Sequence, residues 1–140
     1  MDNLKTIYQK WDVEIKVKSN CRTTNTIEAD STQINEIFSN ILENAYQSFP
    51  GKKGTIEIDM DCNSQENKII IIFRDNGIGI DEKDLPKITD PFFTTKARGI
   101  GLGLTVCKQI VSLHKGELEF QSVKGKGTTV VISLPIRRKL

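Results

Sequence analysis

The polar stretch "RDNGIGI", from Arg74 to Ile80, has residue types suited to binding a flat ligand. Asp75 ends an apolar run, and Gly77 and Gly79 follow it. An ionised carboxylate only accepts hydrogen bonds, and glycine lets the backbone bend sharply around a ligand. Adenine would offer such a carboxylate an amino donor, whereas guanine would offer an oxygen that it repels. Asp-Asn-Gly is equally common as a simple turn, so both interpretations stay open here.

A second candidate is the glycine series Gly99, Gly101 and Gly103, just before or at the start of a predicted helix. The first amides of a helix lack internal partners and the helix dipole is positive there, so an anion is favoured. Lys96 and Arg98 could reach the same charge. The series matches neither a P-loop nor the dinucleotide fingerprint. It predicts a phosphate site on a segment that can open and close like a lid.

Amide side chains form a stripe along the first predicted helix, at Gln33, Asn40, Asn44 and Gln47. At about 100° per residue these positions fall beside the apolar face of the helix. Asparagine is a poor helix former, so two of them in mid-helix suggest that they bind a partner. For this helix taken alone, amides that simply face solvent are the more common explanation.

The last candidate is Thr128, which follows Gly127 at the start of the final predicted strand. Its hydroxyl could reach a base or a bridging water. Threonine is also frequent in strands without any binding role, and that explanation is the better supported one from the sequence.

Two amphipathic helices and a sheet are predicted to position these residues. Apolar residues at helical spacing follow a capping residue, Asp30, and continue to Phe49, and a second such helix spans residues 102–114. Strands are predicted at residues 13–17, 26–29, 55–61, 68–75, 117–123 and 128–135. The pair 55–61 and 68–75 forms a hairpin, and the nearly continuous apolar run of 68–75 is typical of a central strand covered on both faces.

The segment between the predicted strand 68–75 and the second predicted helix, residues 76–101, shows at most one helical turn near 82–87. Irregular segments of this length in compact domains are usually functional or mobile. The mixed order of strands and helices predicts an α+β fold, with one mixed, mostly antiparallel sheet and helices on one face.

Length and composition predict one ordinary globular domain over residues 1–140, with its first strand starting near 13 and its last ending near 134. The chain has 140 residues, of which 37% are hydrophobic and 27% charged. The net charge of +2 is spread along the chain, which argues against a nucleic-acid-binding face. No apolar run approaches the roughly 20 residues that span a membrane, so we expect a cytoplasmic chain without membrane contact.

The three cysteines, Cys21, Cys62 and Cys107, are an odd number at wide spacings. This pattern fits neither a disulfide framework nor a zinc site, and it predicts a reducing compartment.

Taken in order, five motifs resemble the boxes of the ATP-binding catalytic domain of sensor histidine kinases. They are Asn-x-x-x-Asn, Asp-x-Gly-x-Gly, Phe-Phe-Thr-Thr-Lys, Gly-x-Gly-x-Gly and Gly-Thr. The resemblance runs from about Val13 to Leu134 and extends to the Bergerat-fold superfamily of gyrase, MutL and heat-shock-90 proteins. It implies a two-layer α/β sandwich that binds ATP and Mg²⁺, with ADP as the product.

The resemblance also implies a role for each matched residue. Asn44 would hold Mg²⁺ through its side-chain oxygen, while Asn40 and Lys96 would act at the triphosphate. Asp75 would accept from the adenine amino group, supported by Thr128. The remaining implied nucleotide contacts are Gly77, Gly79, Ile80, Phe93, Thr94, Thr95, Gly99, Gly101, Leu102, Gly103 and Leu104.

Asn40 stands where ATP-hydrolysing members of the superfamily typically carry a glutamate that activates water. A neutral amide cannot take a proton, so the resemblance implies feeble hydrolysis and transfer of the γ-phosphoryl group to a separate nucleophile. In histidine kinases that nucleophile is a histidine on a dimerising helical hairpin. The only histidine, His114, precedes a glycine at a predicted helix end, where a structural role is favoured.

The predicted partners are therefore a histidine-bearing dimerisation domain of the same parent protein and, downstream, a response regulator. The isolated chain is expected to be a monomer that cannot phosphorylate itself. Two alternatives remain open: a serine kinase of the anti-sigma-factor type, which shares the fold, and a nucleotide-sensing module without transfer chemistry. The stretches "PFFTTK" and "GLGL" resemble sensor kinases more closely.

Overall fold

The computed structural model describes residues 11–21, 31–63, 65–90 and 103–136. The predicted strand at 26–29 lies outside these residues. In chain order the described elements are β1 (Asp12–Ser19), α2 (Ser31–Gln47), β2 (Lys53–Asn63), β3 (Lys68–Asp75), the short 3-10 helix η1 (Leu85–Lys87), α3 (Gly103–Leu113), β4 (Glu117–Val123) and β5 (Gly127–Pro135).

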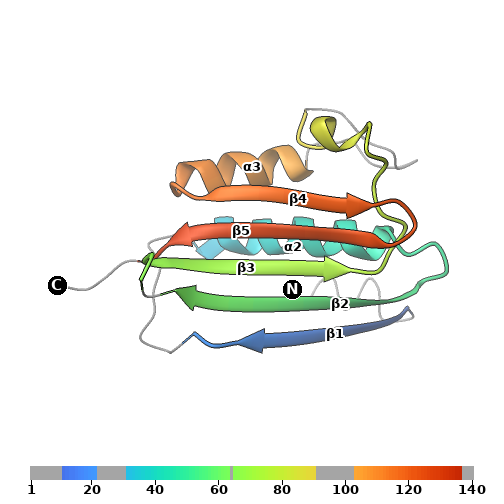
Figure 1. Ribbon diagram of the computed structural model, residues 1–140, viewed down its shortest axis with the longest axis horizontal. Helices are drawn as coiled ribbons and strands as arrows, with labels where there is room; N and C mark the ends of the chain where they lie inside the picture. Colours follow the sequence, from blue (N-terminus) through green and yellow to red (C-terminus); the bar gives the residue numbers. More distant parts are fainter. Residues whose placement is uncertain (1–10, 22–30, 64, 91–102, 137–140) are drawn as a thin grey trace.

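The strands form one sheet in the order β1-β2-β3-β5-β4. β1 pairs with β2 in parallel, and the other three pairs are antiparallel. Both helices lie on the same side of this sheet (Figure 1). α2 lies behind the central strands, and α3 lies next to α2. The predicted α+β fold, with a mixed, mostly antiparallel sheet and one covered face, is confirmed, and so is the hairpin of β2 and β3.

The core lies between the helices and the inward face of the sheet. On α2, Ile37, Ile41 and Ala45 recur every fourth residue and are buried, because this spacing puts them on one stripe. On α3, Cys107 and Val111 are buried against the same cluster. Within the described part of the chain, no helix has both the length and the apolar composition needed to cross a membrane.

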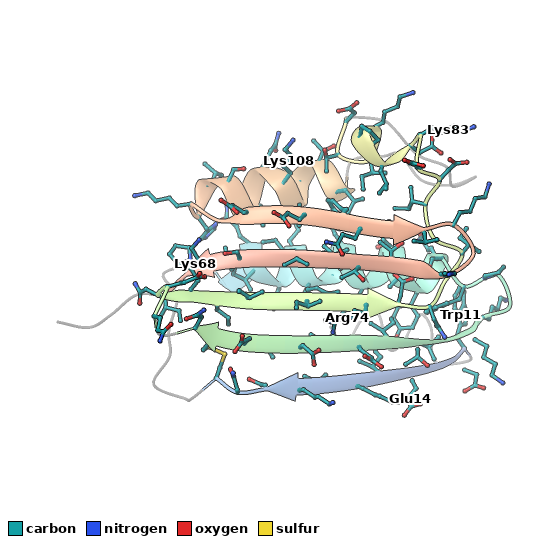
Figure 2. All side chains as sticks on the ribbon, in the orientation of Figure 1. Trp11, Glu14, Lys68, Arg74, Lys83 and Lys108 are labelled. Carbon is teal, nitrogen blue, oxygen red and sulfur yellow. A yellow bond between two sulfur atoms is a disulfide. The ribbon has the colours of Figure 1, made fainter. Side chains whose placement is uncertain are left out.

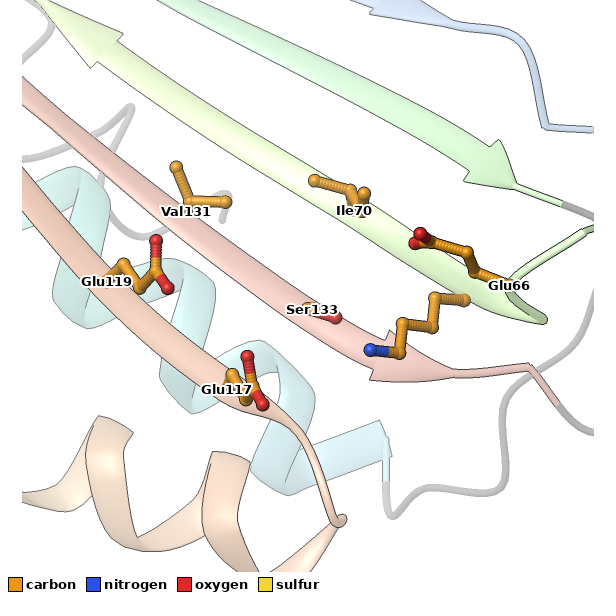
Figure 3. Close-up of a pocket in the computed structure, with 7 residues that line it drawn as sticks. Glu66, Ile70, Glu117, Glu119, Val131 and Ser133 are labelled. Carbon is orange, nitrogen blue, oxygen red and sulfur yellow. The ribbon is translucent and has the colours of Figure 1, made fainter.

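β3 is central, as predicted, but the prediction that both of its faces are covered is wrong. Ile71 and Phe73 are buried under the helices, whereas Ile70 and Ile72 point to the open face and are half-buried. A continuous apolar run cannot distinguish these two cases, because both strand faces read alike in the sequence. Figure 3 shows the open face, where a shallow depression is lined by Glu66, Lys68, Ile70, Glu117, Glu119, Val131 and Ser133.

α3 ends at Leu113, close to the predicted Lys115-Gly116 stop, and its last turn has the hydrogen bonds of a Schellman motif. The N–H of Gly116 donates to the carbonyl of Val111 at 2.9 Å, and that of Lys115 to Ser112 at 3.0 Å. Lys115 takes the left-handed position with a φ of 59°. His114 lies just past the helix, with Nδ1 2.8 Å from the carbonyl oxygen of Ile110. This contact agrees with the structural role expected for His114.

Cys21 and Cys62 form a disulfide, with a Cα–Cα distance of 5.0 Å (Figure 2). The parallel pairing explains the contact, since Ser19 lies opposite Met60 and the same register brings residue 21 beside residue 62. The expectation that the cysteines form no disulfide is therefore wrong for this pair. Disulfides are rare in reducing compartments, so the bond weakens the inference of a reducing location.

Candidate functional site

Asp75 is the last residue of β3, and the described residues hold one of its two carboxylate oxygens, Oδ1. Oδ1 accepts from the backbone N–H groups of Gly77 at 3.0 Å and Thr128 at 3.3 Å. The Ser48 hydroxyl lies 3.5 Å from the same oxygen. Among the described residues none donates a hydrogen bond to Oδ2. The side chain is thus held in one orientation with one acceptor left for a ligand.

Burial raises the pKa of Asp75 above its ordinary value of 3.8, because the ionised form loses solvation. The hydrogen bonds from Gly77, Thr128 and Ser48 act in the opposite direction, and burial outweighs them. Because the pKa is raised in the folded state, the protonated Asp75 contributes to folding stability below pH 3.8. This stability is lost as the pH rises through the raised pKa of the folded protein. At neutral pH the ionised carboxylate therefore reduces stability, which is common for functional groups.

The loop after Asp75 packs tightly between α2 and the turn joining β4 to β5. A Cβ on Gly77 would lie 1.9 Å from Ser48 Oγ, and one on Gly79 would lie 2.2 Å from the carbonyl oxygen of Val123. The N–H of Ile78 donates to the Ser48 carbonyl at 2.9 Å. Any side chain at these two glycines would push the loop away from its supports, so the glycines allow the loop to lie beside Asp75.

Gly79 also has a φ of +71°, which L-residues rarely adopt. We expect Gly79→Ala to lower the free energy of unfolding by about 2–4 kcal/mol, because it adds a backbone clash to the cost of the left-handed conformation. Gly125→Ala is the matched control: its φ is +86°, but a Cβ there would meet nothing within 4 Å. It should lose only about 1 kcal/mol in urea denaturation. Equal losses for the two variants would contradict the predicted clash.

The opposite side of the site comes from β4 and β5. Thr128 is the register partner of both Asp75 and Ser122. Ser122 Oγ accepts from the N–H of Ile80 at 2.7 Å and lies 2.9 Å from both Thr128 Oγ1 and the Gly127 carbonyl oxygen. The structure thus brings Thr128 beside Asp75 and Ile80, although Thr128 lies 53 residues after Asp75 in the sequence.

Sequence reasoning missed two residues of this cluster, Ser48 and Ser122. Ser122 did carry a signal, since strand alternation puts it on the inward face after Leu118 and Phe120, where a polar side chain is unusual. Ser48 had none, because it follows the last residue of α2 and reaches Asp75 only through the tertiary fold.

α2 presents Asn40, one of the two predicted asparagines, toward the start of α3. The Nδ2 of Asn40 donates to the carbonyl of Gly103 at 3.3 Å, linking the helices where α3 begins. Asn44 is half-buried one turn further along, toward Ser48 and Asp75. Asn40 and Asn44 therefore lie along the stretch of α2 that leads from the first residue of α3 to Asp75.

Gln47, at the end of the amide stripe, differs from the two asparagines. Gln47 is exposed and donates to the side chain of Glu43 at 3.3 Å, so the solvent-facing explanation holds for it. Leu104 is half-buried at the start of α3. Eight predicted residues lie outside the described part of the chain: Phe93, Thr94, Thr95, Lys96, Arg98, Gly99, Gly101 and Leu102.

Cys107 lies on α3, one turn after the Gly103 that contacts Asn40. Its Sγ is 3.8 Å from the carbonyl oxygen of Ile37 on α2. Burial raises the pKa of its thiol to about 11. The thiolate is therefore scarce at neutral pH, and Cys107 acts as a small packing residue rather than a nucleophile.

Comparison with known proteins gives one consistent match. The family model described as histidine kinase-, DNA gyrase B-, and HSP90-like ATPase matches residues 29–138. Sporulation kinase E of Bacillus subtilis is 39% identical over 112 residues, which are 80% of this chain and 15% of that protein. The sensor histidine kinase WalK of the same organism is 35% identical over 119 residues, covering 81% of this chain and 19% of that one.

Among solved structures, the catalytic domain of the histidine kinase ThkA superposes with a TM-score of 0.79 at 26% identity. The match covers 96% of this chain and 88% of that domain. The chain thus corresponds to nearly all of a solved catalytic domain, but it spans less than a fifth of the length of the two full-length relatives.

Proposed function

The chain belongs to the family of histidine kinase-, DNA gyrase B- and HSP90-like ATPases, and from this we propose that it is the ATP-binding catalytic domain of a two-component sensor histidine kinase. The geometry of Asp75 supports this proposal most directly. Its Oδ1 is held by two backbone amides, while no described residue donates a hydrogen bond to Oδ2. An acceptor fixed in this way fits the exocyclic amino group of adenine.

The surroundings of Asp75 also fit a flat base. Gly77 and Gly79 let the loop pack against Ser48 and Val123 and so lie beside Asp75, and Thr128 adds a hydroxyl on the same face of the sheet as Asp75. Guanine would place its oxygen against Asp75 Oδ2, so two acceptors would face each other unpaired. We therefore propose ATP rather than GTP as the nucleotide.

The phosphates would lie along α2 toward the start of α3, beside Asn40 and Asn44. Mg²⁺ prefers oxygen ligands and keeps several waters, so the Asn44 side-chain oxygen and the phosphates suffice to hold it. Among the described residues no group of three or more His, Cys, Asp or Glu is placed to bind a metal, which fits an ion that arrives with the nucleotide. When bound, Mg²⁺ would neutralise phosphate charge. Lys96 and Gly101 remain predicted phosphate contacts.

Asn40 favours transfer over hydrolysis. Its amide is engaged with the Gly103 carbonyl and has no basic site with which to deprotonate water. We therefore propose that the γ-phosphoryl group passes to a histidine supplied by another domain, leaving ADP. His114 does not fill that role, since its Nδ1 lies against the Ile110 carbonyl at the end of α3.

The proposed partners follow from this reaction: a histidine-bearing dimerisation domain of the same parent protein and a response regulator downstream. A single domain over the whole chain, a monomeric state in isolation, a cytoplasmic location and the lack of direct contact with membrane or nucleic acid stay predictions.

We expect the chain, mixed with ATP, Mg²⁺ and the histidine-bearing hairpin of its parent protein, to place an acid-labile phosphate on the hairpin. The chain alone should acquire none, because it lacks the acceptor. Radiolabelled ATP followed by acid and base treatment measures both results. An acid-stable phosphoserine on a partner would favour the serine-kinase alternative instead, and ATP binding without transfer to the hairpin would favour a nucleotide-sensing module.

A further inference from the structure

We propose that Ser122 is a positioning residue that fixes the Thr128 hydroxyl as a hydrogen-bond acceptor toward the base, and so contributes to the preference for adenine over guanine. The inference rests on the proposed function, because it requires that the base lie beside Asp75 and Thr128.

Ser122 is placed where the strand pattern calls for an apolar side chain. Leu118 and Phe120 precede it on the inward face of β4 and pack against the core. Ser122 is half-buried at the end of this row and contacts three polar groups, one from the loop after β3 and two from the start of β5. It therefore joins the loop after β3 to the start of β5 instead of filling the core.

The hydrogen atoms around Ser122 can be assigned by counting. A serine hydroxyl has one hydrogen to donate and can accept two. The N–H of Ile80, at 2.7 Å, can only donate to Ser122, and the carbonyl of Gly127, at 2.9 Å, can only accept from it. All three contacts are hydrogen bonds only if the single hydrogen of Ser122 goes to Gly127. The remaining contact, 2.9 Å from Thr128 Oγ1, is a hydrogen bond only if Thr128 is the donor.

This assignment determines whether the Thr128 hydroxyl can donate or only accept a hydrogen bond in the site. With its hydrogen directed at Ser122, the Thr128 hydroxyl offers only lone pairs to anything else in the site. Its backbone N–H is also engaged, since it donates to Asp75 Oδ1 at 3.3 Å. Asp75 and Thr128 are register partners with side chains on the same face, so a base there meets acceptors from both residues.

Adenine and guanine differ at the edge that meets these acceptors. Adenine carries an amino donor, which such a pair accepts directly or through water, whereas guanine carries an oxygen that finds no donor. Without Ser122 the Thr128 hydroxyl is free to rotate and donate to the guanine oxygen. Loss of Ser122 should therefore reduce discrimination by about the value of one hydrogen bond, roughly tenfold in the affinity ratio.

The test compares ADP and GDP affinities, by isothermal titration calorimetry, for the wild-type chain and three serine variants. We expect Ser122→Ala to lower the ratio of ADP to GDP affinity about tenfold. Ser122→Thr keeps a hydroxyl in a strand position and should restore the ratio. Ser133→Ala removes a strand serine from the open face of the sheet, away from Asp75, and should leave the ratio unchanged.

A folded Ser122→Ala protein with the wild-type ratio would overturn the proposal. An equal loss of ADP and GDP affinity would also overturn it, because that result would show that Ser122 only supports the loop after β3 and does not affect the choice of base. Should the alanine variant not fold, Ser122→Cys replaces the hydroxyl with a much weaker hydrogen-bonding group, and a wild-type ratio in that variant would overturn the proposal equally. A wild-type chain that binds neither nucleotide overturns the proposed function, whereas wild-type ADP selectivity in a folded Ser122→Ala or Ser122→Cys protein overturns only the role of Ser122.

Discussion

Replacing Asp75 with asparagine is expected to lower the affinity for ADP and ATP by about 100-fold or more while the fold persists. The asparagine oxygen can still accept from Gly77 and Thr128, which now hold Oδ1 of Asp75. The group that replaces Oδ2 is then an amide NH₂, which puts a donor against the adenine amino donor. Two desolvated polar groups are left unpaired, and each unpaired group costs about 1–3 kcal/mol.

Unlike the nucleotide affinity, the folding stability of the Asp75→Asn variant should stay the same or increase. Burial raises the pKa of Asp75, so the ionised carboxylate reduces stability at neutral pH, and a neutral amide removes that penalty. We expect Asp75→Asn to unfold at the same urea concentration as the wild type, or a higher one, at pH 7. As the pH falls through the raised pKa the wild type becomes protonated, and the difference between the two proteins should shrink.

Titration calorimetry and urea denaturation on the same preparations measure both effects. Asp59→Asn is the matched control, since Asp59 lies on the open face and pairs with Arg74 at 2.6 Å near the surface. It should leave nucleotide affinity unchanged. Wild-type affinity in Asp75→Asn would refute the adenine contact, and loss of the fold together with binding would make Asp75 a structural residue.

The fold was largely predictable because each element leaves a periodic signal in its own segment. Alternation at 13–17 became β1, and apolar residues at helical spacing up to Phe49 became α2 (Ser31–Gln47). The spacing of apolar residues could not show whether one face or both faces of β3 are covered by helices. Ile70 and Ile72 are as apolar as Ile71 and Phe73, yet only the latter pair meets helices.

The site was predictable where one short segment carries the chemistry, as in the Asp75-to-Ile80 loop. It was not predictable where the chemistry is a contact between segments. Ser122 and Ile80 are 42 residues apart, and Ser48 and Asp75 are 27 apart. Cys21 and Cys62, 41 residues apart, meet only because β1 and β2 pair in parallel in one particular register.

Replacing Asn44 with alanine is expected to lower phosphoryl transfer to a histidine acceptor by about 100-fold or more, since oriented charge neutralisation supplies most of the catalysis in such reactions. Asn44 lies on α2 one turn from Asn40 and is the proposed protein ligand of Mg²⁺. Alanine is the better helix former, so α2 should persist. The adenine contact at Asp75 is not altered, so affinity for ADP in the presence of a chelator should change less than about threefold.

Single-turnover transfer and ADP titrations with Mg²⁺ or chelator separate a metal ligand from a packing residue. Asn35→Ala is the control, because Asn35 is exposed on the same helix and should affect neither measurement. A metal ligand predicts that the wild type gains affinity when Mg²⁺ is added and that Asn44→Ala does not. If the variant instead loses ADP affinity equally with and without Mg²⁺, Asn44 supports the shape of the pocket and the proposed metal role is wrong.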